Sequence, residues 1–350
     1  MATVATESKL IHYSGAIRFP SSCGDTGMAH HDPPYVRSVI DGFDAEALLG
    51  VVRDARFEQR LLAAGHFRAC LQRLVFPRFS LDSGAYTLPI FASGSFSRNL
   101  VSLALAVSCR LPMWANGRAV AAGQLLVFAE DSELNVRPAA GGWEWAVLLI
   151  ERDVLQKAAI GRVGRELIVP RTGWYCGDAM PRVARELRST IFRVLKDASR
   201  WPPDVSRDRV ASEGNALLGA FIDAVACADA GREVPRTDDW MRRRRDELIR
   251  RAERYLKSHL DRPFDSGALA MSLGIGERRI ERLFLDSYGQ SPCRWHLTAR
   301  LNATRHELVH AGEGQRVTDI ALRMGFSHLG RFSDEYRRIF GEYPSETLRH

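Results

Sequence analysis

Two stretches near the C-terminus repeat one design, and this repeat constrains the fold more than any other feature of the chain. The stretches cover residues 268–292 and 319–344, and they are offset by about 51 residues in their front halves and about 52 in their back halves. The matched pairs are Leu269 and Ile320, Ala270 and Ala321, Gly274 and Gly325, Phe284 and Tyr336, Gly289 and Gly341, and Pro292 and Pro344. A shared offset indicates one small unit built twice. The order of apolar residues and glycines in each unit predicts a helix, a tight turn and a second helix, which is the layout of a helix-turn-helix.

The turn of each unit explains its small residues. Gly274 and Gly325 stand where the chain leaves the first helix, and glycine adopts the left-handed conformation of a helix C-terminus without steric cost. Ala270 and Ala321 stand where the second helix must cross the first closely, so a small side chain is expected there.

The second helix of each unit is amphipathic. The predicted buried stripes, at spacings of 3 and 4, are Ile280, Leu283 and Phe284 in the first unit and Phe332, Tyr336, Ile339 and Phe340 in the second. The opposite faces carry guanidinium groups, which can bind guanine edges in a major groove and hold phosphates. The candidate DNA-contacting residues on these faces are Arg278, Arg279, Glu281, Arg282, His328, Arg331, Asp334 and Arg337.

A long helix is expected to connect the two units. Trp295, Leu301 and Leu308 recur near helical spacing between them. Such a helix would hold the two recognition helices at a fixed separation. Two of these helices enter successive major grooves if they lie about one DNA turn, roughly 34 Å, apart.

With both units and their connector in place, residues 246–350 resemble the DNA-binding domain of the AraC/XylS family of transcription regulators. The matching residues are Leu269, Ala270, Arg282, Leu283, Phe284, Gly289, Ser291, Pro292, Arg300, Leu301, Ala303, Leu308, Ile320, Ala321, Gly325, Phe326, Phe332, Phe340, Gly341 and Pro344. The resemblance implies a DNA-binding domain over 241–350 that recognises double-stranded promoter or operator DNA with two helix-turn-helix motifs. If the protein is an activator, RNA polymerase is a further partner.

The chain departs from the family pattern at two places. Family members carry Ser at the start of the first recognition helix, where this chain has Gly276, so no side chain caps the helix. In the second unit Leu329 and Gly330 lie near the end that faces the groove and offer no polar side chain. We therefore expect the first unit to supply more of the sequence discrimination.

The charge distribution agrees with a DNA-binding C-terminus. Residues 241–350 contain 21 Lys and Arg against 15 Asp and Glu, which accounts for six of the net charge of +7. An excess of positive charge on this part is what attraction to phosphates requires. A length of 350 residues indicates two or three domains.

Other features place the protein in the cytoplasm and away from membranes. We find no apolar run of about 20 residues and no basic-then-apolar signal pattern at the N-terminus. The six cysteines are scattered without a CxxC motif, which favours reduced thiols.

The N-terminal part predicts a β-rich domain. Residues 1–60 lack clear periodicity and are expected to be partly disordered, whereas residues 67–150 show strand patterns. Asn116-Gly117 between short apolar runs is a strong signal for a two-residue hairpin. Many short strands with glycine-bearing turns favour a barrel or a sandwich. By the family resemblance we expect a cupin-like β-barrel with helices over 61–235, which senses a small-molecule effector, and an α+β multidomain fold overall.

No metal site or cofactor is expected. His12, His30 and His31 lack further ligands at metal spacing, and His66 is the only histidine between His31 and His259. The histidine cluster that metal-bearing cupins carry in the barrel is therefore missing.

Residues 151–240 turn helical. One helix is expected over Arg182–Lys196, and a second carries the apolar stripe Leu217, Leu218, Phe221, Ile222 and Val225. That stripe either packs against the barrel or, by the family analogy, forms a homodimer interface. Residues 231–239 look like an interdomain linker, and the run Arg242–Arg245 after it either starts a solvated helix or touches phosphates.

These features favour a transcription regulator controlled by a small effector, without catalytic residues. One alternative is a barrel enzyme fused to a DNA-binding tail, but Ser95 and Ser97 have no GxSxG context and no paired carboxylates stand out in the β region. Another alternative is a DNA-binding protein without an effector.

Overall fold

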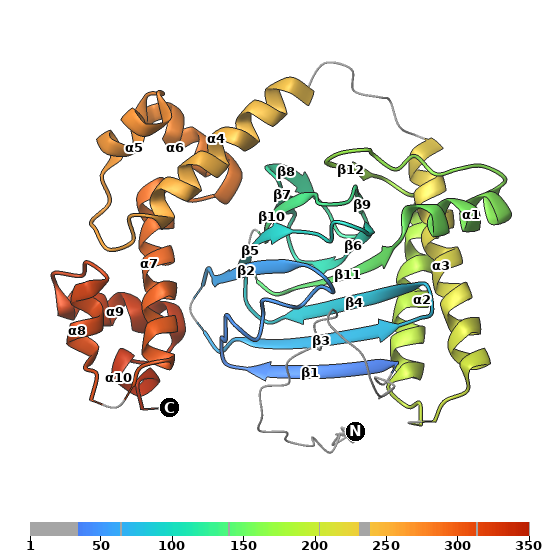
Figure 1. The fold of residues 1–350 in the computed structure, drawn as a ribbon, viewed down its shortest axis with the longest axis horizontal. Helices are drawn as coiled ribbons and strands as arrows, with labels where there is room; N and C mark the ends of the chain where they lie inside the picture. The colour runs from blue at the N-terminus through green and yellow to red at the C-terminus, as the bar shows by residue number, and fades with distance from the viewer. Residues whose placement is uncertain are drawn as a thin grey trace, which may run out of the picture.

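The computed structural model describes residues 34–349 except 64, 139–140, 203, 231–238 and 313. It has a β-rich N-terminal part and an all-helical C-terminal part, which lies on the side of the sheets opposite helices α2 and α3 (Figure 1). The predicted linker at 231–239 lies almost entirely outside the described residues.

The larger sheet has seven antiparallel strands in the order β1-β3-β4-β11-β6-β9-β12. Their bounds are β1 Tyr35–Asp41, β3 Arg68–Val75, β4 Phe79–Tyr86, β11 Trp143–Ile150, β6 Val101–Cys109, β9 Leu125–Phe128 and β12 Trp174–Gly177. Strand β1 lies within residues 1–60, where no strand was predicted, so the sheet begins at Tyr35 and not near residue 67. Strand β12 comes from a region predicted to be helical.

The smaller sheet has five antiparallel strands in the order β2-β5-β10-β7-β8. Their bounds are β2 Arg56–Leu61, β5 Ile90–Ser95, β10 Glu133–Pro138, β7 Met113–Ala115 and β8 Arg118–Val120. Asn116 and Gly117 join β7 to β8 with φ values of 47° and 76°. Positive φ at both central residues is the type I′ geometry, which confirms the predicted hairpin.

The expected closed barrel is not what the strands form. Among the described residues no ladder joins the edge strands β1 or β12 to the five-stranded sheet, so the two sheets remain separate. Strand patterning left a barrel and a sandwich open, because alternation shows which face of a strand is buried and not whether its edges are paired. The two separate sheets form a sandwich-like arrangement.

The interior strand β6 shows how the layers are built. Leu103, Leu105 and Val107 point to a core shared with the helices, while Ala104 and Ala106 point to the space between the sheets. Both faces of the strand are therefore buried, which explains its continuous apolar sequence. The helices on the outer face are α1 Arg152–Val163, α2 Pro181–Ala198 and α3 Arg207–Ala230.

The apolar stripe of α3 belongs to this core. Leu217, Phe221, Ile222 and Val225 are buried in the same cluster as the sheet and α2. The stripe therefore packs against the sheet of the same chain, which was the first of the two interpretations of it. Helix α3 is long and apolar enough over Arg207–Asp229 to cross a membrane, by length and composition only, and half of that stretch is buried in the protein.

The C-terminal part is helical. The bounds of its helices are α4 Asp239–Lys257, α5 Ser266–Leu273, α6 Glu277–Tyr288, α7 Pro292–Val309, α8 Val317–Arg323, α9 Leu329–Phe340 and α10 Pro344–Thr347. One apolar cluster joins α4, α5, α6 and the start of α7, whereas the core of the second unit is continuous with the one between the two sheets. Helices α5 and α6 lie near one end of α7, and α8 to α10 lie near its other end (Figure 1). This confirms the predicted arrangement of two units and a long connecting helix.

Candidate nucleic-acid interface

The two helix-turn-helix units close their turns with the same hydrogen bonds. In the first unit the Ile275 N–H donates to the Ala270 carbonyl at 3.3 Å, and in the second the Phe326 N–H donates to the Ala321 carbonyl at 2.9 Å. Gly274 has a φ of 66° and Gly325 a φ of 71°. The repeat predicted from the sequence is thus a repeat of backbone geometry.

Helix α7 holds both units through buried side chains. Trp295, which is 1% exposed, packs edge-on against Phe284 of α6 at 6.0 Å between ring centroids. At the second unit the Arg300 guanidinium donates to the Met324 carbonyl at 2.8 and 3.1 Å and stacks on the Phe326 ring. Burial lowers the pKa of Arg300. Because both units pack against α7, this helix fixes their relative positions; its 18 residues span about 27 Å at ~1.5 Å per residue.

The exposed face of α6 presents unpaired charges. Arg278, Arg279, Glu281 and Arg282 are all exposed. Within the described part of the chain, none of these four side chains makes a hydrogen bond or an ion pair. The predicted stripe of Ile280, Leu283 and Phe284 is buried on the other face, together with Tyr288. Free guanidiniums on a rigid helix are suited to binding base edges and phosphates.

The face of α9 is similar but sparser. His328 at the helix start, Arg331 and Asp334 are exposed and have no side-chain partner among the described residues. Arg337, however, stacks on the ring of Tyr343 at 4.5 Å and donates to its hydroxyl at 2.5 Å. The neighbouring arginine, Arg338, is paired with Glu335 on the same helix. The charges nearest the N-terminus of the helix are therefore the ones that remain available.

The C-terminal end of α6 contacts the N-terminal domain instead of solvent. Arg137 of β10 is buried, stacks on Trp114 at 4.2 Å and donates to the Ser287 carbonyl at 3.3 Å. Arg245 lies 3.8 Å from Asp286 and donates to the Ser287 hydroxyl at 3.4 Å. In the run Arg242–Arg245, this last arginine thus links α4 to α6 within the C-terminal domain, and the side chains of the first two lie outside the described residues.

Further contacts along this boundary fix the domains to each other, and sequence periodicity gave no signal for them. Lys257 of α4 lies 2.6 Å from Glu58 of β2, and Arg250 lies 2.7 Å from Glu133 of β10. The buried Arg60 lies over the Trp295 ring at 4.4 Å. These partners are between 117 and 235 residues apart in the chain, so only the tertiary fold brings them together.

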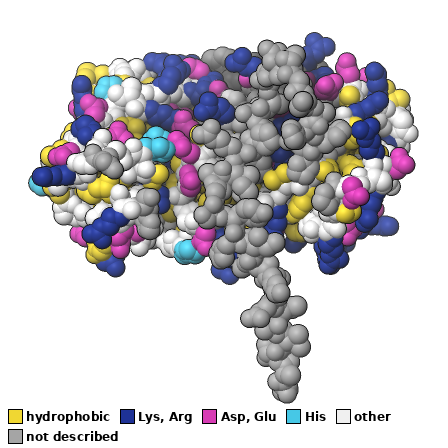
Figure 2. All heavy atoms as spheres, turned by 60° about the horizontal axis from the view of Figure 1, so that its bottom comes forward, with side chains coloured by type: hydrophobic (Ala, Val, Ile, Leu, Met, Phe, Trp, Pro, Cys, Tyr) yellow, Lys and Arg dark blue, Asp and Glu magenta, His cyan; other side chains and the backbone are white. Residues whose placement is uncertain are grey.

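The surface seen in Figure 2 carries Lys and Arg side chains over both domains, with acidic side chains among them. The concentration of net charge in residues 241–350 therefore does not produce a uniformly basic C-terminal face in this view. The specific feature of the C-terminal domain is the unpaired set at the N-terminal halves of α6 and α9.

Comparisons with known proteins agree with this geometry. A family model described as "Helix-turn-helix domain" matches residues 269–350. The chain is 37% identical over 103 residues to a probable thc operon regulatory protein of Rhodococcus erythropolis. The matched stretch covers 29% of this chain and 31% of that protein. It is also 35% identical over 100 residues to the XylDLEGF operon transcriptional activator of Pseudomonas putida. That matched stretch covers 28% of this chain and 31% of that protein.

Among solved structures, a probable AraC family transcriptional regulator from Rhodopseudomonas palustris CGA009 is 37% identical, with 29% of this chain and 95% of that chain covered and a TM-score of 0.28. The chain thus spans about a third of the length of the curated relatives it matches. The matched part coincides with the two helix-turn-helix units and their connecting helix. Through this C-terminal domain, the chain belongs to the AraC/XylS family of transcription regulators.

Proposed function

We propose that the protein is a transcription regulator that binds double-stranded DNA through the N-terminal halves of α6 and α9. The observation that supports this most directly is the unpaired set of Arg278, Arg279 and Arg282 on the exposed face of α6. Holding three guanidiniums close together without counter-ions is unfavourable in the free protein. Phosphates supply the missing negative charges, and guanine edges supply hydrogen-bond acceptors for the same guanidiniums.

The DNA-binding test uses a duplex selected by the protein from a random library, with a scrambled duplex as reference. Arg282→Ala should lose about 1–3 kcal/mol of discrimination between the two duplexes, as expected for one bidentate base contact. Arg323→Ala is the matched control, because that arginine is paired with Glu307 at 2.9 Å. An affinity that does not fall with salt, or an Arg282→Ala variant with full discrimination, would refute the proposed role of α6.

The two units should contribute unequally. Arg331 and Asp334 are the free charged groups on the exposed face of α9, and Gly330 beside them has open space around it. We therefore expect Arg331→Ala to reduce discrimination less than Arg282→Ala. Equal losses in the two variants would contradict the unequal roles.

We further propose that the N-terminal domain binds a small effector between its two sheets. An apolar cavity of about 70 Å³ lies there, and it exists because alanines occupy inward-facing positions of several strands. The alanines that line it are Ala92, Ala104, Ala106 and Ala115. Two polar atoms in its lining residues, the Gln59 amide oxygen and the Trp143 indole nitrogen, are buried without a hydrogen-bond partner among the described residues.

An effector that fits this cavity is a small, mainly apolar or aromatic molecule with one hydrogen-bond donor and one acceptor. Such a ligand would satisfy both buried atoms, each of which costs about 1–3 kcal/mol when unpaired. Its binding would favour one of two states of the protein and so alter DNA binding. The expected cupin-like character of this domain stays a prediction, as do the homodimer and the cytoplasmic location.

A thermal-shift screen of small aromatic and apolar acids, alcohols and amides tests the effector. A ligand that raises the unfolding midpoint of the native chain should lose its effect in Ala106→Leu, which fills the cavity. Val107→Leu is the control, because Val107 lies on the opposite face of the same strand. A ligand that stabilises both variants equally binds elsewhere and refutes the proposed cavity.

A further inference from the structure

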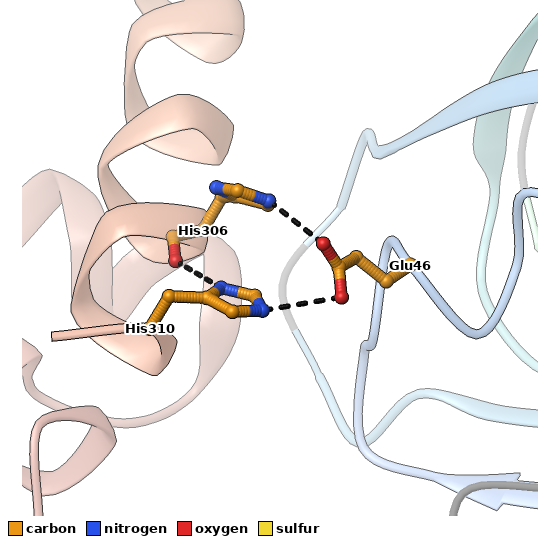
Figure 3. Close-up of side chains that lie close together, drawn as sticks. All are labelled: Glu46, His306 and His310. Atoms are coloured by element: carbon orange, nitrogen blue, oxygen red, sulfur yellow. Dashed lines mark hydrogen bonds and ion pairs between the residues drawn. The ribbon is translucent and has the colours of Figure 1, made fainter.

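Three side chains that commonly bind metal ions meet at the boundary between the two domains: Glu46, His306 and His310 (Figure 3). Glu46 lies in the segment between β1 and β2, and the histidines lie at the C-terminal end of α7. His306 Nε2 is 3.0 Å from one carboxylate oxygen of Glu46, and His310 Nε2 is 3.1 Å from the other. One ligand atom from each residue lies within 4.8 Å of those of the other two. Neither the DNA-binding face nor the apolar cavity uses these groups.

The helix places the two imidazoles together. His306 and His310 are one helical turn apart, so they share a face of α7, and their ring centroids are 4.4 Å apart. His310 Nδ1 lies 2.8 Å from the His306 carbonyl oxygen, which can only accept, so Nδ1 carries a proton. In the neutral ring this leaves the lone pair on Nε2, the atom that faces Glu46. A backbone carbonyl on the far nitrogen is the support that metal-binding histidines usually have.

The backbone segment that carries Glu46 is also held in place. The Asp44 carboxylate accepts hydrogen bonds from the backbone N–H groups of Glu46 at 2.9 Å and Ala47 at 3.1 Å. The same segment is fixed to α7, because the Arg305 guanidinium donates to the Phe43 carbonyl at 2.8 Å. The backbone that carries Glu46 is thus fixed relative to the helix that carries both histidines.

We propose that Glu46, His306 and His310 form an interdomain site for Zn²⁺, with water completing a tetrahedral shell. Imidazole nitrogens and a carboxylate oxygen are the donor types that zinc favours. Zn–N and Zn–O bonds of about 2.0–2.2 Å require neighbouring ligand atoms roughly 3.3–3.5 Å apart. The two nitrogen–oxygen pairs, one to each carboxylate oxygen of Glu46, are at 3.0 and 3.1 Å, and the three ligand atoms all lie within 4.8 Å of one another, so small side-chain rotations bring them to these distances. Binding displaces any proton from the Nε2 atoms, since each nitrogen gives its lone pair to the metal.

The surrounding charges favour a cation. Asp44 adds a second carboxylate beside the site, and the C-terminus of α7 contributes the negative end of its helix dipole. Arg305 also lines this pocket, but its guanidinium is paired with Glu342 at 2.9 Å. A bound Zn²⁺ would tie the N-terminal domain to the helix that carries both helix-turn-helix units, and so fix the arrangement of the two domains.

The test measures zinc binding directly on the full chain, so it does not depend on the proposed regulatory function. The protein is stripped with a chelator and then titrated with ZnCl₂ in competition with a chromophoric chelator. Glu46→Gln, His306→Gln and His310→Gln should each weaken zinc binding at one site by at least about tenfold, because each removes a direct ligand. Zinc should also raise the unfolding midpoint of the native chain and not of these variants.

His66→Gln is the matched control. His66 is an exposed histidine that pairs with Asp41 at 2.5 Å without a second histidine, so its loss should leave zinc affinity unchanged. Other zinc-binding groups, such as Cys293 and the N-terminal histidines, are the same in every variant. Unchanged affinity and stoichiometry in all three ligand variants would overturn the proposal and leave a hydrogen-bonded His–Glu contact only. An equal loss in His66→Gln would also overturn it. Circular dichroism shows whether each variant is folded.

Discussion

Gly274 and Gly325 end the first helix of the two helix-turn-helix units and are equivalent in sequence. The structure nevertheless predicts that replacing them by alanine costs different amounts of stability. Both have left-handed backbone conformations, so replacing either by alanine costs about 1–2 kcal/mol. A Cβ added at Gly274 meets nothing within 4 Å. A Cβ added at Gly325 lies 2.2 Å from the backbone oxygen of Asp261 and 2.9 Å from Arg300 Nη2.

The additional clash sets the size of the difference. Overpacking of this kind costs a further ~1–3 kcal/mol, because backbone must move to relieve it. We therefore expect Gly325→Ala to destabilise its unit by about 2–5 kcal/mol and Gly274→Ala by about 1–2 kcal/mol. The excess corresponds to a roughly 5–150-fold larger equilibrium constant for local opening in the second unit.

Hydrogen–deuterium exchange followed by mass spectrometry measures this without assuming a single unfolding step. The informative peptides cover residues 266–289 and 317–341, one from each unit, and each variant serves as the control for the other. Losses of protection that agree within about 0.5 kcal/mol would refute the reasoning. They would mean that the chain near Asp261 gives way freely, so that the close approach at Gly325 carries no energetic cost.

Three further predictions concern stability. Asp82→Ala should destabilise the N-terminal domain by about 3–5 kcal/mol in urea denaturation, because it removes the buried carboxylate that lies 2.5 Å from the buried Arg73 guanidinium; a loss below about 1 kcal/mol would contradict this. Asp265→Ala should cost about 1 kcal/mol, since the carboxylate caps α5, and exchange of the 266–289 peptide would report it. A hydrogen bond to the His306 carbonyl and the nearby Glu46 raise the pKa of His310 in the folded protein. The protonated His310 side chain therefore stabilises the fold below the ordinary histidine pKa of 6.5, and this stability is lost as pH rises through the pKa of His310 in the folded protein. In the presence of a chelator, the difference in unfolding midpoint between the native chain and His310→Gln should thus be larger at pH 5.5 than at pH 8, and a difference independent of pH would contradict it.

The sequence alone determined the features that depend on short-range patterns. The repeat with its two glycine turns, the buried stripes of α6 and α9, and the Asn116-Gly117 hairpin all follow from local periodicity or from the backbone preference of single residues. Each of these signals is contained within a few turns of helix or a few residues of strand, so no knowledge of distant partners is needed. The same patterns also placed the candidate DNA-contacting charges on exposed faces.

The tertiary structure decided the features that join distant parts of the chain. Strand patterns did not show that the sheets would stay separate, since edge pairing is independent of which face is buried. The i, i+4 pair of His306 and His310 is visible in the sequence, but Glu46 lies 260 residues before the first of them. Periodicity carries no information on which loop packs against which helix. Only the docking of the two domains brings that carboxylate to the histidines, because such contacts depend on shape and charge across a whole interface.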